Sequence, residues 1–239
     1  MNKAIIFDTG PIITLTLNNL LWILKPLKEK FNGEFIICPA VFYELIQKPL
    51  TTKKYKFEAL QILPYIMDNT IKLKEDEEII KKSNELIKLA NNCFIAKGNP
   101  INIFHKGEME AIATALLTNS NTIAIDERST RLLIENPYLL QKHLQKKLHT
   151  NIQINHHNVQ KIKKIIDKIK VIRSFELGLI AYETNLLNKY ILKEEENLRE
   201  IKDIRESVLE GMLWAIKLAG CSVKTEEIYK IVDYELNNC

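Results

Sequence analysis

The stretch from Lys3 to Gly10, KAIIFDTG, constrains the fold more than any other part of the chain. Its central residues are apolar, and a turn-prone Thr-Gly-Pro sequence closes the run. A short continuous apolar run of this kind is typical of a strand buried on both faces of a parallel sheet. Asp8 ends the run, and ligands bind at the carboxyl ends of such strands, so its carboxylate is expected to face a site. A simpler interpretation is equally open, in which Asp8 caps the helix that begins near Pro11.

Strand and helix signals alternate through the first two thirds of the chain. Further strands are expected at Glu34–Cys38, Thr70–Leu73 and Thr122–Asp126, with a short fifth strand at Asn151–Ile154. Helices are expected between them, the longest over residues 75–96. This alternation predicts an α/β fold, specifically a three-layer α/β/α sandwich around a parallel five-stranded sheet.

The pattern changes after residue 155. Four helical segments are expected over residues 156–170, 173–187, 192–219 and 224–237, without a further strand signal. We therefore predict an α/β domain over residues 1–155 and an all-helical C-terminal extension over residues 156–239, which can pack back on the core.

Composition places few limits on function. The net charge of +4 over 239 residues is mild, so an argument for nucleic-acid binding must rest on where the charges lie. The N-terminus leads directly into a strand, and the apolar stretch Ile12–Leu24 is short and interrupted by polar residues, so neither export nor membrane insertion is expected. The four cysteines lack metal-ligand spacing, which favours reduced, mostly buried thiols in the cytoplasm.

Acidic side chains recur where the predicted strands end. Asp8 and Asp126 follow two strands expected to be neighbours, and Glu44 lies on the helix after the second strand. Glu108 begins the helix before the Asp126 strand and shares a helical face with the small apolar residues that must pack on the sheet. Glu110 is about 200° away on that helix and is expected to face solvent.

Four carboxylates gathered at one edge of a sheet repel one another unless cations lie among them. Mg²⁺ or Mn²⁺ suits such oxygen ligands. One or two of these ions can activate water and stabilise the attacking and leaving oxygens of a phosphodiester. The sequence therefore predicts a metal-dependent hydrolase site.

Three segments resemble the PIN domain family of metal-dependent ribonucleases. They are IIFDTGPIITL at Ile5–Leu15, ICPAVFYEL at Ile37–Leu45 and GEMEAIATALLTNSNTIAIDERSTR at Gly107–Arg131. The GE-x-EA and IDE-R variants look like the archaeal and bacterial branch related to VapC-type toxins. The likeness covers residues 3–154, and the chain is much longer than a compact toxin of that type.

The resemblance implies roles for individual residues. Asp8, Glu44, Glu108 and Asp126 are similar to the metal-binding catalytic acids of the family. Thr9 matches a hydroxyl residue that orients a carboxylate or water. Glu127 is a further candidate for a ligand or a proton-transfer group, although it can equally face away. The implied partners are an RNA substrate, a second copy of the chain and an antitoxin-like protein.

Basic residues are concentrated between Lys142 and Arg173, where Asp167 is the only acid. One interpretation is an RNA-binding surface, with the helix lysines Lys161, Lys163 and Lys164 as contacts. The other is an ordinary solvated helix face. Arg128 and Arg131 follow Asp126 closely and are better placed to bind a phosphate, although Arg131 can also form a salt bridge on its own helix.

Two other functions compete with the ribonuclease. A PIN-like scaffold could bind RNA or protein without cleaving it, but such a scaffold is expected to have lost acids that this chain retains. A phosphatase of the haloacid dehalogenase type could use Asp8 as a nucleophile. That chemistry requires a second acid two residues later, where this chain has Gly10.

Overall fold

The computed structural model describes residues 3–191 and 204–237 and contains a parallel five-stranded sheet. The strand order is β3-β2-β1-β6-β8, and every neighbouring pair is parallel. The strands are β1 (Ala4–Phe7), β2 (Glu34–Ile37), β3 (Lys72–Leu73), β6 (Thr122–Ala124) and β8 (Lys170–Ile172). The predicted α/β class and parallel sheet are confirmed.

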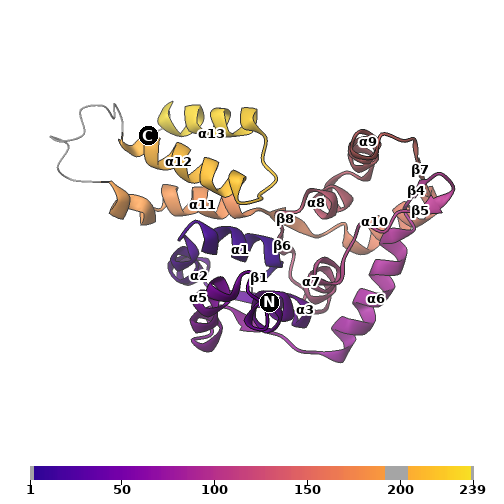
Figure 1. Cartoon of the computed structure of the whole chain (residues 1–239), viewed down its shortest axis with the longest axis horizontal. Coiled ribbons are helices and arrows are strands. Elements are labelled where there is room, and N and C mark those ends of the chain that lie inside the picture. Colours follow the sequence, from indigo (N-terminus) through magenta and orange to yellow (C-terminus); the bar gives the residue numbers. More distant parts are fainter. Residues whose placement is uncertain (1–2, 192–203, 238–239) are drawn as a thin grey trace.

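Helices cover both faces of this sheet (Figure 1). One face carries α1 (Thr9–Leu17), η1 (Leu21–Ile23), α2 (Leu24–Phe31), α3 (Pro39–Phe42), η2 (Tyr43–Gln47), α4 (Lys48–Leu50) and α5 (Lys56–Met67). The other carries α6 (Glu77–Asn91), α7 (Lys106–Leu117), α8 (Arg128–Glu135), α9 (Pro137–Leu148) and α10 (His156–Ile166). The architecture is therefore the expected three-layer sandwich.

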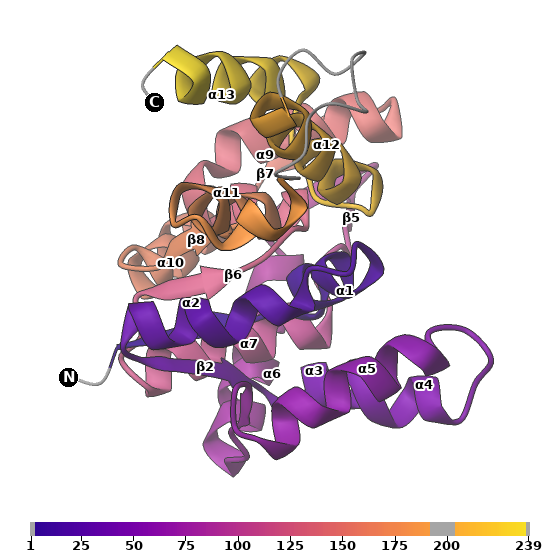
Figure 2. The same cartoon turned by 90° about the vertical axis from the view of Figure 1, so that its left-hand side faces the viewer.

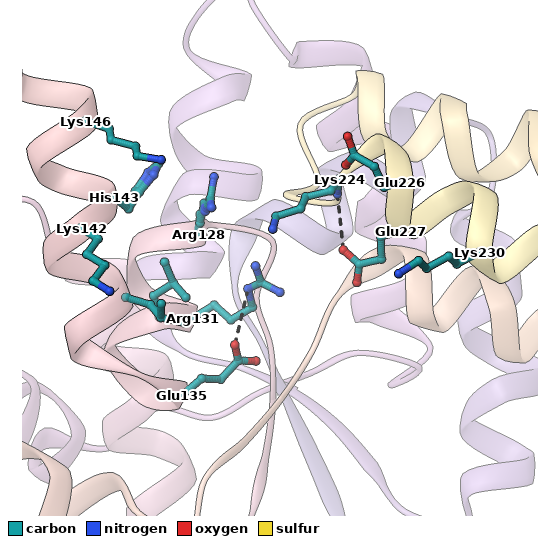
Figure 3. A pocket seen from close by; sticks show the side chains of 12 residues that line it. Arg128, Arg131, Glu135, Lys142, His143, Lys146, Lys224, Glu226, Glu227 and Lys230 are labelled. Atoms are coloured by element: carbon teal, nitrogen blue, oxygen red, sulfur yellow. Dashed lines mark hydrogen bonds and ion pairs between the residues drawn. The ribbon is translucent and has the colours of Figure 1, made fainter.

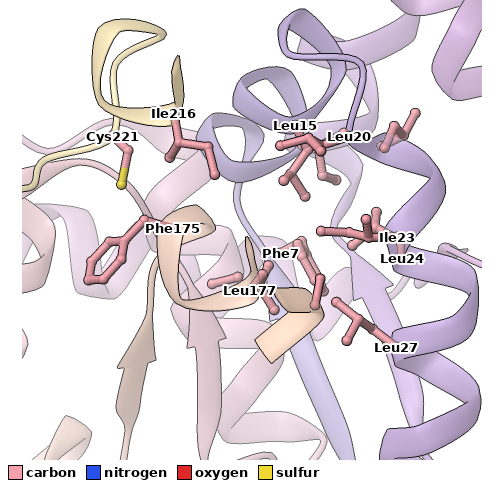
Figure 4. Close-up of a cluster of buried hydrophobic side chains, with 14 of the residues drawn as sticks. Phe7, Leu15, Leu20, Ile23, Leu24, Leu27, Phe175, Leu177, Ile216 and Cys221 are labelled. Atoms are coloured by element: carbon pink, nitrogen blue, oxygen red, sulfur yellow. The ribbon is translucent and has the colours of Figure 1, made fainter. Parts of the chain in front are cut away.

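The side chains of β1 show why two helical layers are needed. Ile5 and Phe7 belong to one buried cluster, whereas Ile6 belongs to the other. Successive side chains of a strand point to opposite faces, so a continuous apolar run must be covered on both. Figure 4 shows Phe7 packed among residues of α1, η1 and α2 and beside Leu177 of the C-terminal region, while Phe175 lies farther away in the same cluster.

Two expectations about strands are wrong. The segment expected as the fifth strand of the main sheet, β7 (Ile152–Ile154), instead joins a small antiparallel sheet with β4 (Phe94–Ala96) and β5 (Asn99–Pro100). The fifth position is taken by β8, in a region where no strand was expected. The long helix predicted over residues 75–96 likewise ends at Asn91, because its last residues form β4. Strand pairing across long sequence separations decided these cases.

The C-terminal region is otherwise helical and packs on the core. It contains α11 (Ser174–Glu183), η3 (Leu186–Tyr190), α12 (Ile204–Leu218) and α13 (Thr225–Asn237). Figure 2 shows α11, α12 and α13 stacked above the sheet, and α11 contacts both α1 and α12. The first part of the predicted helix 192–219, residues 192–203, lies outside the described residues.

None of the helices within the described ranges combines the length and apolar character that a bilayer span requires. Cys38, Cys93 and Cys221 are free and buried, as expected, while Cys239 lies outside the described residues. Burial raises the pKa of the Cys93 thiol to about 12, so this thiol stays protonated and unreactive.

Candidate active site

Asp8 and Asp126 lie side by side because β1 and β6 are adjacent parallel strands. The Asp8 backbone N–H donates to the carbonyl oxygen of Ala124 at 3.0 Å, which continues the strand pairing to the ends of both strands. Gly10 fits closely between the two acids. A Cβ atom at Gly10 would lie 3.3 Å from Cβ of Asp126 and 3.8 Å from Oδ2 of Asp8. The two aspartates are therefore neighbours at the ends of adjacent strands, as expected.

Glu44 reaches the same point from the neighbouring strand. Pro39 starts α3 directly after β2, and the chain then widens into the π-helical turn η2, which carries Glu44. Such π turns are frequent at functional sites. A Cβ atom at Gly107 would lie 3.3 Å from Oε1 of Glu44 and 3.6 Å from Oδ1 of Asp8. The Thr9 hydroxyl donates to Oε2 of Glu44 at 2.6 Å, so Thr9 orients this carboxylate.

Glu108 is buried near the other acids but is engaged locally. Its Oε2 accepts the backbone N–H of His105 at 2.9 Å, as part of the capping box that begins α7. Glu127 behaves similarly, since its Oε2 accepts the backbone N–H of Thr130 at 2.7 Å and caps α8. The structure places both acids beside the site, each holding the start of a helix.

Glu110 does not face solvent, and that expectation is wrong. Its side chain is fully buried, and Oε2 accepts the backbone N–H of Ala40 at 2.8 Å, at the start of α3. Lys106 lies 3.4 Å from Oε1. Every residue of α7 from Gly107 to Ala115 is buried, because α3 and α6 pack on the sides that the sheet leaves open. Since this part of α7 has no solvent-exposed face, the 3.6-residue periodicity could not predict which of its side chains are buried.

Asp126 is held by the C-terminal region. Its Oδ1 accepts the backbone N–H of Ser174 at 2.7 Å, and its Oδ2 accepts the Ser174 hydroxyl at 2.7 Å. The backbone N–H of Ser222 donates to the Asp126 carbonyl oxygen at 3.2 Å. The carboxylate therefore sits at the start of α11, where exposed N–H groups favour negative charge.

Burial and mutual repulsion disfavour the ionised forms of two of these acids, and the described part of the protein supplies no cation to offset them. Burial raises the pKa of Asp8 to about 7, and the charges of Glu44 and Asp126 add to the increase. Burial also raises the pKa of Glu108 to about 8, with Asp8 and Glu127 acting in the same direction. Across the described ranges, none of the four acids forms an ion pair with a Lys, Arg or His.

The four acids are nevertheless not gathered around one point. Over residues 3–191 and 204–237, no group of three or more His, Cys, Asp or Glu side chains is close enough together to hold a metal ion. Asp8 and Glu44 meet at Gly107, Asp126 is turned toward Ser174, and Glu108 is turned toward His105.

The basic residues predicted to bind RNA lie in two places. Arg128 and Arg131 are on α8, directly after Asp126, and Arg131 approaches Glu135 on its own helix at 4.0 Å. The second group is on α10. Lys161 and Lys164 are exposed there, whereas the Lys163 ammonium donates to the Ile134 carbonyl oxygen at 3.2 Å.

Sequence reasoning missed Gly107 and Ser174. Gly107 leaves the space into which Glu44 and Asp8 point, but a single glycine at a helix start carries no distinguishing signal. Ser174 follows β8, and the β-branched pair Val171–Ile172 before a helix was the available sign of another strand-to-helix junction facing the site.

Comparison with known families agrees with this architecture. A family model described as a PIN domain matches residues 4–139, which include all four candidate acids. No significant match is found among curated proteins or among solved structures. PIN domains are typically nucleases and generally use divalent metals. Since the match spans more than half of the chain, we conclude that this protein belongs to the PIN domain family.

Proposed function

We propose that this protein is an endoribonuclease that hydrolyses RNA phosphodiester bonds with Mg²⁺ or Mn²⁺ held by Asp8, Glu44, Glu108 and Asp126. The convergence of Asp8 and Glu44 at Gly107 carries the proposal. Two carboxylates from separate strand ends point there without a basic partner, in a chain of a family whose members are typically nucleases.

The donor set fits a hard cation. The four side chains offer only carboxylate oxygens, which Mg²⁺ and Mn²⁺ prefer. The pKa of Asp8 is raised chiefly by burial and also by the nearby acids, so its ionised form would be stabilised by a bound cation that the described residues themselves do not supply. Gly107 provides the space, because any side chain there would press on the Glu44 carboxylate. Glu108 has the weakest support from geometry, since it is bound to the His105 N–H.

The chemistry supplied by a bound Mg²⁺ or Mn²⁺ is activation of water and neutralisation of charge on the phosphate. In the overall reaction, water adds to phosphorus, the P–O3′ bond breaks, and one water proton ends on the departing 3′ oxygen. The products are a 3′-hydroxyl and a 5′-phosphate. Thr9 orients Glu44, and Ser174 orients Asp126 through both carboxylate oxygens.

A non-cleaving PIN scaffold that binds RNA or a protein is the alternative. The observation in its favour is that no three carboxylates come together within the described part of the chain. In this alternative, Asp126 and Glu108 serve the helix starts that they now cap.

The proposed setting follows from the same observations. Buried free thiols favour a reducing cytoplasm. RNA is the proposed substrate, and a homodimer or a complex with an antitoxin-like protein is the proposed assembly. Light scattering of the purified chain, alone and after co-expression with neighbouring genes, tests the assembly.

The decisive experiment is a nuclease assay on mixed RNA with Mg²⁺, Mn²⁺ or EDTA, comparing the wild type with Asp8→Asn. Asp167→Asn is the matched control, because Asp167 is an exposed aspartate at the end of α10. We expect cleavage that requires metal, is lost in Asp8→Asn and is retained in Asp167→Asn.

The contrary outcome is equally clear. If the wild type binds RNA but leaves it intact with either metal, the scaffold alternative replaces the nuclease. If Asp8→Asn cleaves as fast as the wild type, the proposed site is wrong.

A further inference from the structure

A large cleft separates the PIN core from the last helix of the chain (Figure 3). Its volume is about 1000 Å³, at the upper end of the range for small-molecule pockets. Helices α8 and α9 form one wall, and the start of α13 with the residue before it forms the other. The lining residues are Arg128, Arg131, Leu132, Glu135, Leu139, Lys142, His143, Lys146, Lys224, Glu226, Glu227 and Lys230.

The lining is strongly basic. Six lysines and arginines and one histidine face three glutamates. One of these acids, Glu227, is paired with Arg173 at 2.8 Å, and another, Glu135, is only 4.0 Å from Arg131. Within the described ranges, no carboxylate forms an ion pair with any of the other five cations, which are Arg128, Lys142, Lys146, Lys224 and Lys230.

Two further observations indicate an anionic ligand. The Nε atoms of Arg128 and Arg131 are buried and have no hydrogen-bond acceptor in the described structure. Buried guanidinium donors without partners are costly unless a ligand supplies the acceptors. Burial is the largest cause of the lowered pKa of His143, and the positive charges of Arg128 and Lys147 lower this pKa further.

Both walls of the cleft begin beside Asp126. Arg128 follows Asp126 by two residues on the α8 side. On the other side, Ser222 donates its backbone N–H to the Asp126 carbonyl oxygen and precedes Lys224 by two residues. The cations therefore extend away from Asp126 along α8 and α9 on one wall and along the start of α13 on the other.

We propose that this cleft binds the phosphates of an RNA strand flanking the cleavage site, with α13 of the C-terminal extension forming one wall. The inference rests on the proposed function, since it assigns the path by which RNA reaches the acids. Cations spread over two walls match a chain of phosphates, whereas a charged lining of this size is unlike the mostly apolar pocket of a small ligand. The cleft depends on residues beyond 139, so the matched PIN domain does not contain it.

The test measures binding of a labelled single-stranded RNA to the full chain in EDTA, where metal-dependent cleavage does not interfere. One variant, K142Q/K146Q, alters the α9 wall, and another, K224Q/K230Q, alters the α13 wall. The control, K81Q/K88Q, removes two exposed lysines without ion pairs from α6, outside the cleft. All three variants lose the same charge.

Each wall variant is expected to lower the slope of log affinity against log salt by about 1.4, from about 0.7 for each phosphate contact on a single strand. If affinities converge near 1 M salt, this slope change corresponds to roughly 25-fold weaker binding at 0.1 M salt. The control should bind like the wild type. In the unmodified protein, bound RNA should protect the four cleft lysines from acylation, but not Lys81 or Lys88.

The outcomes separate this inference from the proposed function. If the wild type cleaves RNA while both wall variants bind and cleave as it does, the cleft assignment is wrong and the nuclease stands. If the wall variants lose affinity as expected but the wild type never cleaves RNA, the cleft stands and the nuclease is wrong. Equal losses in all three variants, or no RNA binding by the wild type, overturn the cleft.

Discussion

Arg173 is the residue whose removal should most clearly loosen the C-terminal region from the core. Its side chain is only 8% exposed, and its guanidinium donates to Oε1 of Glu227 on α13 at 2.8 Å and to Oε1 of Glu176 on α11 at 3.0 Å. It also donates to the Ser222 carbonyl oxygen at 3.2 Å and lies over the Phe175 ring. One side chain thus joins both helices to the loop that contacts Asp126.

The expected cost follows from what Arg173→Met leaves behind. The methionine keeps an apolar stem, but two carboxylates lose their partner and the Ser222 carbonyl loses a donor. Removing one member of a fully buried pair costs about 3–5 kcal/mol. Glu176 and Glu227 are 34% and 35% exposed, so water offsets part of this cost and about 2–3 kcal/mol is expected. For a chain of this size, that loss lowers Tm by about 4–12 °C.

Thermal and urea unfolding of the full chain would measure the loss, and a double-mutant cycle with Glu227→Gln would isolate the pair. The control is Lys82→Met, since Lys82 forms an exposed pair with Glu85 at 3.2 Å on α6 and should lose at most about 0.5 kcal/mol. A coupling energy below about 0.5 kcal/mol between Arg173 and Glu227, or a loss no greater than the control's, would refute the reasoning.

Three further predictions concern pH, metal and RNA. Burial acts to raise the pKa of Glu227, but the hydrogen bonds and charge of Arg173 outweigh burial, and the pKa is lowered. The wild type should therefore have a higher Tm than Glu227→Gln above about pH 4.5, and this difference should vanish in more acidic buffer. At pH 8 in EDTA, Asp8→Asn should melt above the wild type, because a carboxyl with a pKa raised to about 7 destabilises the fold when ionised. Mg²⁺ should raise the Tm of the wild type but not that of Asp8→Asn. An equal rise in Tm for both proteins would contradict the metal site. Reversing the charge of Lys161, Lys163 and Lys164 on α10 should weaken RNA binding and flatten its salt dependence. Unchanged binding would show that this surface does not contact RNA.

The acids that the sequence placed correctly are those fixed by local strand signals. Asp8 and Asp126 each follow an apolar run, and the ends of parallel neighbours must meet at one edge of the sheet. Glu44 could be placed with them because only a short helical segment separates it from β2. In each case, a local pattern and one topological rule were sufficient.

The errors came from contacts that no local pattern encodes. Glu110 is buried because α3 and α6 close around α7, and the 3.6-residue period describes one helix without its neighbours. The fifth strand of the main sheet was expected at Asn151–Ile154, whereas β8 occupies that position. Only the partners β4 and β6 distinguish the two segments, and each partner lies far away in sequence.

The C-terminal extension contributes directly to the surroundings of Asp126 and is more than an appendage. The boundary predicted at residue 155 stays a prediction, but β8 beyond it pairs with β6 and covers what would otherwise be an open sheet edge. Directly after β8, Ser174 binds both carboxylate oxygens of Asp126. A chain ending at residue 155 would therefore lose the strand beside Asp126, its hydrogen-bond donors and one wall of the basic cleft together. Since Arg173 joins α11 to α13 next to these contacts, the geometry around Asp126 depends on helices that lie beyond the matched residues 4–139.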